Sequence, residues 1–227
     1  MPNWCWNNLE VTPSGDDKDL KHFKSFVGKL LFIIDEAGQP AKDELTGEVF
    51  EKRDTFDYLV GKDEDYTEAN WYEHNLSRYG TKWDVAPSDF MSQAEDDILD
   101  NEFFSAGFQT AWSPPIGFCI LLSQLYQVRV EITFDESGDY YAGKGIWENG
   151  EQIECWSLPL MEGMYKIDDD WFWNEAQNNY EYWAEEGTSI KEATGEYKAF
   201  LTPADYKRLR TEYREAKKEY KESLKTK

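Results

Sequence analysis

The most apolar continuous stretch of the chain lies near its middle and predicts a buried helix. A strand-like run over residues 102–112 precedes it and ends at Trp112. Ser113 can cap the new helix, and Pro114 suits the first helical position because no backbone N–H is needed there. The residues that follow, up to Tyr126, are mostly apolar. We therefore expect a strand, a sharp turn and a core helix around which the fold is organised.

Strands are predicted on both sides of this helix. Residues 4–11 form a short β-prone run, and residues 128–134 alternate polar and apolar side chains. Two more runs, 140–147 and 152–158, follow across short turns. Alternation with a period of two places side chains on opposite faces of a sheet, and short turns join antiparallel neighbours. We expect an antiparallel sheet that ends in a three-stranded meander, and a further strand starting at residues 81–84.

Apolar residues at three-four spacing predict helices in the first half of the chain. One helix is expected to start at Asp16 or Asp17 and to bury residues as far as Leu30, and another is expected over residues 68–79. Residues 35–68 are rich in charged side chains and are interrupted by glycine and proline. We interpret them as an irregular acidic insertion.

The chain becomes helical after residue 158. An aromatic stripe predicts a helix over residues 168–186, and Thr202-Pro203 starts a last helix whose apolar positions continue for about two heptads. Packing of this helix on the body is favoured over dimerisation through it. We predict an α+β domain over residues 1–158 and a helical C-terminal region over residues 159–227.

The charge of the chain restricts its partners. The net charge is −22, whereas residues 201–227 carry nine Lys and Arg against five Asp and Glu. The acidity therefore belongs to the body, which argues against direct binding of nucleic acid or of anionic membranes. It fits a basic surface on a partner protein, or solubility alone.

Three widely spaced cysteines, Cys5, Cys119 and Cys155, indicate reduced core thiols in a cytoplasmic protein. No stretch is long and apolar enough to span a membrane, and the N-terminus lacks the features of a secretory signal. His22 and His74 are not spaced as metal ligands, and no nucleotide-binding loop or nucleophile motif is present. We expect no catalytic residue, metal or cofactor.

Two groups of residues are candidates for binding. Aromatic side chains beside a lysine and a carboxylate can hold a small ligand, and this pattern occurs at Lys82, Trp83, Asp84, Trp112 and Ser113. The competing interpretation is a structural corner in which the tryptophans pack together and Asp84 caps a backbone.

The other candidate is the helix over residues 168–186. Aromatic residues flanked by carboxylates can anchor an arginine-rich surface. This pattern predicts a partner-binding surface that contains Asp168, Asp169, Asp170, Trp171, Trp173, Glu181, Glu185 and Glu186. The competing interpretation is a core stripe with a solvated acidic back.

Several of these stretches resemble the YubB-like ferredoxin-like family, whose members are accessory proteins of conjugative plasmids and bacteriophages. The resemblance rests on residues 1–5, on Trp71-Tyr72, on residues 79–84 and on residues 108–115. It implies a ferredoxin-like split β-α-β fold, in agreement with the pattern above. Tyr79 departs from the tryptophan common at that position, and residues 35–68 and 160–227 have no counterpart. The family brings no established activity.

Together these observations favour a non-catalytic accessory protein of a phage or plasmid. It would act like a DNA mimic, covering the basic surface of a host defence or nucleic-acid-binding protein. Two alternatives remain: a ligand-binding protein or enzyme that uses the Trp83/Trp112 corner, and an assembly protein that dimerises through its last helix. The partner would be a protein, and the chain a monomer or a weak dimer.

Overall fold

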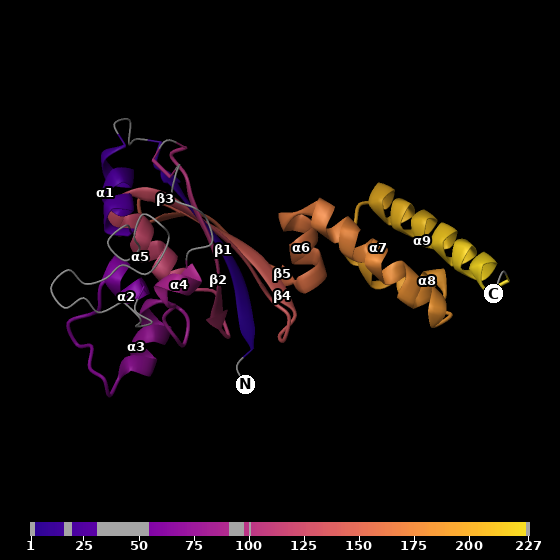
Figure 1. Ribbon diagram of the computed structural model, residues 1–227, viewed down its shortest axis with the longest axis horizontal. Helices are drawn as coiled ribbons and strands as arrows, with labels where there is room; N and C mark the ends of the chain where they lie inside the picture. Colours follow the sequence, from indigo (N-terminus) through magenta and orange to yellow (C-terminus); the bar gives the residue numbers. More distant parts are fainter. Residues whose placement is uncertain (1–2, 16–19, 31–54, 91–97, 100, 226–227) are drawn as a thin grey trace. The chain divides into compact units, whose positions relative to one another are not determined.

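A computed structural model describes residues 3–15, 20–30, 55–90, 98–99 and 101–225 (Figure 1). The chain forms two compact units, Met1–Ser157 and Leu158–Lys227. We call them the sheet unit and the helical unit and describe each by itself. The fold class is α+β, with a five-stranded antiparallel sheet and C-terminal helices, as predicted.

The sheet has the strand order β2-β1-β3-β4-β5. Its strands are β1 (Trp4–Pro13), β2 (Phe104–Ala111), β3 (Val128–Glu136), β4 (Tyr141–Glu148) and β5 (Glu151–Pro159). Strand β1 pairs antiparallel with both β2 and β3, and helix α5 (Ile116–Tyr126) connects these two strands. The result is a split β-α-β unit, in which β1 lies between the two strands that the helix joins.

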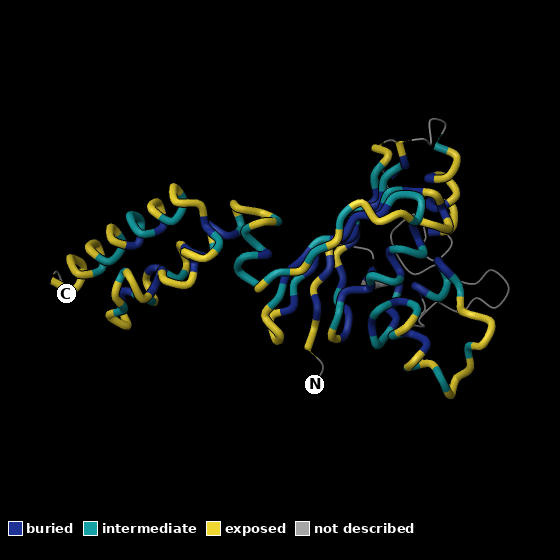
Figure 2. Tube along the Cα trace, turned by 180° about the vertical axis from the view of Figure 1, so that it is seen from behind, coloured by how far each residue is buried: buried dark blue, intermediate teal, exposed yellow. Residues whose placement is uncertain are grey.

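One face of the sheet is covered by helices. Along β1, Cys5, Leu9 and Val11 are fully buried, whereas the alternate residues Trp4 and Trp6 are exposed. Helix α5 packs on β3 and β4, and α1 (Lys21–Leu30) packs on α5 and β1. We call the opposite face, which carries Trp4 and Trp6, the open face; Figure 2 shows the alternation of buried and exposed residues along the strands.

A short helix, α2 (Thr55–Val60), completes this core. Phe56 is fully buried and stacks on Phe118 of α5, with ring centroids 4.1 Å apart. Residues 35–54 of the predicted insertion lie outside the described residues. For residues 55–60 the prediction of an irregular segment is wrong, because three apolar side chains within one and a half turns fill the space over α5.

Local predictions around α3 (Trp71–Arg78) also need correction. This helix buries His74 and Asn75, whereas Trp71 is exposed. Residues 81–83 form bends, not the start of a strand. Helix α4 (Pro87–Phe90) follows these bends along the chain, and its Phe90 is in the core.

The predicted cap of the central helix is wrong as well. Helix α5 begins at Ile116 after Pro115, without a side-chain cap. The hydroxyl of Ser113 donates instead to the carbonyl of Gly80, at 2.6 Å. The predicted start of the first helix, at Asp16 or Asp17, lies outside the described residues.

The helical unit has its own core. It contains α6 (Leu160–Ile167), α7 (Asp169–Glu185), α8 (Ile190–Ala193), a 3-10 helix (Glu196–Ala199) and α9 (Pro203–Ser223). Helices α7 and α9 lie side by side (Figures 1 and 2). Asp168 caps α7 by accepting the N–H of Asp170, and Thr202 caps α9 by accepting the N–H of Asp205.

The apolar residues at the predicted heptad positions of α9 pack into the core of this unit. Leu209 and Tyr213 are fully buried, and Tyr206, Ala216 and Tyr220 pack against the same cluster. This packing is the arrangement that the sequence favoured over dimerisation, and it leaves the apolar side of α9 facing α7 and its neighbours.

Candidate functional site

The sheet unit has a pocket of about 320 Å³ at the edge of its open face. Its walls are the side chains of Trp4, Trp6 and Trp83, the segment Asp84–Ala86 and residues Gly107–Ala111 of the edge strand β2. We call it the tryptophan pocket. Three large aromatic side chains around one hollow suit a cationic or aromatic group.

Strand geometry explains why two of these tryptophans line the pocket. Trp4 is 41% exposed and Trp6 is 56% exposed, because both point to the open face. Their cross-strand neighbours on β2 are Ala111 and Gln109, which are smaller and leave space beside the indole rings. The rings of Trp4 and Trp83 have centroids 5.9 Å apart.

A carboxylate lies beside this aromatic surface. Asp135 of β3 is paired across the sheet with Trp6, so both side chains point to the open face. Partial burial, with a smaller contribution from Glu136, raises the pKa of Asp135. Asp135 is not part of the pocket wall, but its carboxylate lies on the open face beside Trp6.

The predicted corner at Lys82 is assembled, but Lys82 itself fills it. Its ammonium lies 4.6 Å from the ring centroid of Trp83 and 4.5 Å from that of Trp112. The ring of Tyr72 is 6.0 Å away. These are cation–π distances, so the two tryptophans already hold a cation from the chain itself.

Asp84 and Ser113 have structural roles in this corner. Asp84 is 8% exposed, and its carboxylate accepts the backbone N–H groups of Phe56, Asp57 and Val85 at 2.8, 2.9 and 2.6 Å. It thereby caps the start of α2. Burial raises the pKa of Asp84 to about 8. The three N–H donors favour the charged form and lower the pKa, but their effect is smaller than that of burial. The Ser113 hydroxyl is bound to Gly80. The structural interpretation of the corner therefore applies to these two residues.

The acidic helix is only partly available as a surface. The predicted carboxylates of α7 and its ends are exposed, and Trp171 is half-buried. Trp173 is 5% exposed, and the guanidinium of Arg208 lies 4.0 Å over its ring. Trp173 therefore belongs to the core of the helical unit and cannot contact a partner.

The negative charge of the protein is concentrated in the other unit. Residues 1–157 carry 12 Lys and Arg against 31 Asp and Glu, whereas residues 158–227 carry 12 against 15. The acidic helix thus belongs to a unit with nearly balanced charge. The exposed side of α7 also carries the amides Asn174, Gln177 and Asn178 among its carboxylates.

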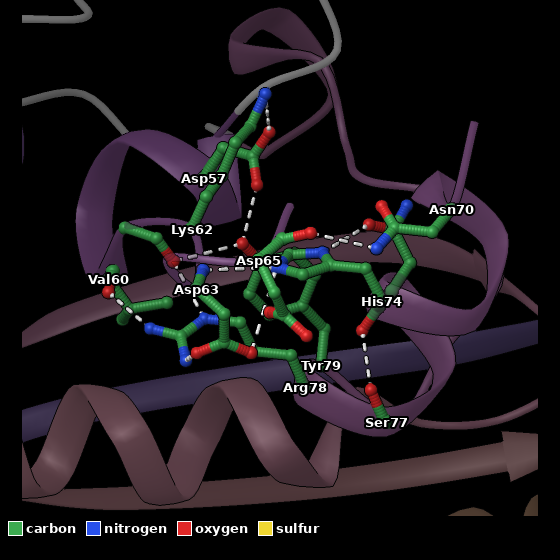
Figure 3. Close-up of polar contacts among 12 residues, drawn as sticks. Asp57, Val60, Lys62, Asp63, Asp65, Asn70, His74, Ser77, Arg78 and Tyr79 are labelled. Atoms are coloured by element: carbon green, nitrogen blue, oxygen red, sulfur yellow. Dashed lines mark hydrogen bonds and ion pairs between the residues drawn. The ribbon is translucent and has the colours of Figure 1, made fainter. Parts of the chain in front are cut away.

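A polar network joins α2 to α3 in the sheet unit (Figure 3). The hydroxyl of Tyr79 donates to Asp57 at 2.5 Å and to the carbonyl of Gly61 at 3.1 Å. The guanidinium of Arg78 donates to the carbonyls of Gly61 and Val60 at 2.7 and 3.1 Å. These donors satisfy carbonyls at the end of α2, which its own helix leaves unpaired.

His74 belongs to the same network (Figure 3). It is 5% exposed, its Nε2 accepts the N–H of Asp63 at 3.2 Å, and its Nδ1 lies 3.3 Å from the side-chain oxygen of Asn75. Both ring nitrogens of His74 therefore face polar partners inside the unit. The network fixes backbone, and we assign it a structural role.

The sequence missed the network and the two tryptophans of β1. The network joins residues that are far apart along the chain, so no local pattern revealed it. Trp4 and Trp6 did carry a signal: two large aromatic side chains alternate with the buried positions of one strand. The predicted core thiols are correct for Cys5 and Cys119, whereas Cys155 is exposed.

Two kinds of feature are absent from the described part of the chain. There, no three His, Cys, Asp or Glu side chains are grouped so that they could hold a metal ion. None of the helices in these ranges combines the length and apolar character needed to cross a membrane.

Comparisons with known proteins identify the central region. Residues 89–172 match the family model of the ferredoxin-like domain in Api92-like protein, which spans β2, α5, β3, β4, β5 and α6. The predicted ferredoxin-like domain is confirmed. No curated protein matches the chain. The crystal structure of protein api92 from Yersinia pseudotuberculosis aligns over 70% of this chain and 98% of that one, with 11% identity and a TM-score of 0.39.

Proposed function

We propose that this protein is a non-catalytic binding protein whose sheet unit docks on the basic surface of a host protein. The partner is a defence protein or another nucleic-acid-binding protein, which is inhibited because the sheet unit covers its nucleic-acid site in the manner of a DNA mimic. The observation that carries the proposal is the tryptophan pocket on the open face of a unit with 31 Asp and Glu against 12 Lys and Arg.

Charge and aromatic surface have different roles in this proposal. The excess of carboxylates speeds the encounter with a basic partner and makes it sensitive to salt. The pocket then takes an arginine or lysine side chain of that partner, with the indoles of Trp4, Trp6 and Trp83 as its contacts, and Asp135 adds a carboxylate beside Trp6 on the open face. Lys82, held between Trp83 and Trp112, is an example of the same chemistry within the chain.

The resemblance to accessory proteins of plasmids and phages also supports a host protein as the partner. Such proteins act inside a host cell, where the nucleic-acid-binding surfaces of defence proteins are basic targets. The exposed carboxylates of the acidic helix α7, such as Asp170, Glu181 and Glu185, belong to the helical unit, and Trp173 is buried there, so the tryptophan pocket replaces this helix as the docking surface in this proposal.

The experiment is capture from bacterial lysate depleted of nucleic acid, with the whole chain immobilised and bound proteins eluted by a salt gradient. We expect basic nucleic-acid-binding proteins to elute at moderate salt, and the free chain to displace DNA from them. Replacing Trp4 and Trp6 by alanine should weaken binding about fivefold to thirtyfold, since a desolvated cation–π contact contributes about 1–2 kcal/mol.

Tyr182→Ala is the matched control, because Tyr182 is 60% exposed and lies in the helical unit. It should leave capture unchanged. Equal capture by the double tryptophan variant would remove the pocket from the proposal. A captured protein that still binds DNA normally in the presence of the chain would refute inhibition. Binding of a small organic cation alone would favour a ligand-binding protein instead.

A further inference from the structure

Six of the seven cations of α9 lie on one side of the helix, whereas Arg208 lies on another side, where it pairs with Glu212 and covers Trp173. With 3.6 residues per turn, these six fall within a sector of about 100°, and they extend over about 21 Å at 1.5 Å per residue. We call this row the basic stripe; it consists of Lys207, Arg210, Arg214, Lys217, Lys218 and Lys221, together with Lys225 in the turn that follows.

The other sides of the helix have different characters. Leu209 and Tyr213 are buried against α7. The carboxylates Glu215, Glu219 and Glu222 form a separate flank. Between Lys207 and Lys225, all of which the structure describes, the stripe sector holds no Asp or Glu. The stripe is therefore an uninterrupted row of positive charge.

Most of these cations are accessible. Lys207, Arg214, Lys218, Lys221 and Lys225 are exposed. Arg214 and its neighbours also line a shallow groove of about 470 Å³ along α9. Among the described residues, the stripe forms one ion pair, between Lys218 and Glu222 at 3.9 Å. An exposed pair of this kind holds its partners weakly.

Two simpler explanations do not account for the whole row. Cations near the end of a helix interact favourably with its dipole, but this effect is confined to the last turn, and Lys207 and Arg214 lie well before it. Lys217 has a structural role, because its ammonium donates to the carbonyls of Gly187 and Thr188 after α7. Neither effect explains why five exposed cations, Lys207, Arg214, Lys218, Lys221 and Lys225, share one side.

We propose that the basic stripe binds the phosphate backbone of duplex DNA without regard to sequence. A straight row of Lys and Arg without large apolar side chains fits a phosphate strand, which is recognised by charge. A membrane surface would require apolar residues for insertion, and the apolar side of α9 is used in the core. This inference stands on α9 alone and does not depend on the proposed function.

The net charge of the chain predicted the opposite, and the division into units resolves this conflict. The helical unit carries 12 Lys and Arg against 15 Asp and Glu, so its charges nearly balance. At physiological ionic strength, charges separated by more than about 8 Å are largely screened. Charges close to the stripe therefore act on a phosphate strand more strongly than the net charge of the whole chain does.

The experiment is fluorescence anisotropy of a labelled 20-base-pair duplex titrated with the whole chain at several salt concentrations. Five exposed cations correspond to a slope of about −4.5 in log K against log salt. The triple variant Arg214→Glu, Lys218→Glu, Lys221→Glu should weaken binding at least a hundredfold. Lys217 is left unchanged because its ammonium binds the carbonyls of Gly187 and Thr188.

The matched control is the triple variant Lys21→Glu, Lys24→Glu, Lys198→Glu, which alters three exposed cations outside α9 and has the same net charge. It should bind within about threefold of the wild type. Equal weakening by both variants, or no binding at low salt, would overturn the proposal. If the triple glutamate variant of α9 loses helicity, the milder variant Arg214→Gln, Lys218→Gln replaces it. We expect this variant to bind DNA at least tenfold more weakly than the wild type.

Two further measurements separate DNA from other anionic partners. One measures the binding of the same proteins to vesicles that contain phosphatidylserine. The other measures their oligomeric state by sedimentation without DNA. Binding to vesicles without binding to DNA would overturn the proposal in favour of a membrane. Salt-sensitive self-association that needs the stripe, again without DNA binding, would overturn it in favour of a second copy of this chain.

Discussion

The two units of this protein are built in different ways. In the sheet unit, β1 pairs with β2 through residues about a hundred positions apart, such as Trp4 with Ala111. In the helical unit, α7 packs on α9, which follows it along the chain. The sheet unit therefore depends on distant contacts, whereas the helical unit forms from neighbouring elements.

The units also differ in how they carry charge. The sheet unit has a large excess of carboxylates, and the helical unit has nearly equal numbers that α9 separates onto different sides. The comparison teaches that one net charge, −22, describes neither unit. The two proposals above follow from this separation, and the predictions below test whether the units are also independent in stability.

The largest expected effect comes from the two cores. Phe56→Ala should lower the free energy of unfolding of the sheet unit by about 3–5 kcal/mol, because it removes a buried ring that stacks on Phe118. Phe172→Ala should have an effect of similar size on the helical unit, since Phe172 is fully buried there. Hydrogen exchange followed by mass spectrometry measures each unit separately.

Each variant should leave exchange in the other unit unchanged. Ile153→Ala is the control, because Ile153 is 57% exposed and should change stability by no more than about 0.5 kcal/mol. Loss of protection in both units from either core variant would show that they unfold together, and the comparison would then fail.

An intermediate effect is expected from Asp84→Asn. The amide nitrogen cannot accept the backbone N–H groups that the carboxylate accepts, so the sheet unit should lose about 1–3 kcal/mol. The pKa of Asp84 is raised from 3.8 to about 8. Between these values the folded state holds a proton that the unfolded state has released, so the free energy of unfolding falls as pH rises.

The helical unit should respond to pH with the opposite sign. Hydrogen bonds from Thr202 and Tyr165 lower the pKa of Asp205, so their contribution is lost as pH falls below the usual range of an aspartate. Urea unfolding of the wild type and of Asp84→Asn at pH 5, 6.5 and 8 measures the pH dependence of stability that we assign to Asp84. A wild-type slope that survives in Asp84→Asn would assign it to another group.

The smallest expected effect is that of Tyr213→Phe. The hydroxyl of Tyr213 donates to the carbonyl of Thr188 at 3.0 Å, and its loss should cost the helical unit about 0.5–1.5 kcal/mol. Thermal unfolding, followed by hydrogen exchange in α9, measures this loss of stability. An effect as large as that of Phe172→Ala would mean that the hydroxyl, not the ring, carries the packing of α9.

Much of the fold could be predicted because its signals are local. Alternation over residues 128–134 identified β3, and the apolar run before Tyr126 identified α5. Three-four spacing identified α7 and α9. These patterns reflect which side of each element faces a core, and that depends only on neighbouring residues.

Where the sequence failed, distant contacts decided the structure. Asp84 was expected in a strand, but its carboxylate binds the start of α2, 27 and 28 residues earlier along the chain. Ser113 was expected to cap α5, but the carbonyl of Gly80 takes its hydroxyl. A local preference yields when a distant backbone group offers a better partner, because an unpaired buried polar group costs more than a lost cap.

The sequence by itself determined the main strands and helices, the class of fold and the total charge. Only the tertiary structure decided which side chains meet. It brought Trp83 beside Trp4 at the edge of the sheet, buried Trp173 under Arg208 and placed the carboxylate excess in one unit. The physical reason is that a repeat along the chain fixes the face on which a residue lies, whereas the neighbours of that face come from packing between elements distant in sequence.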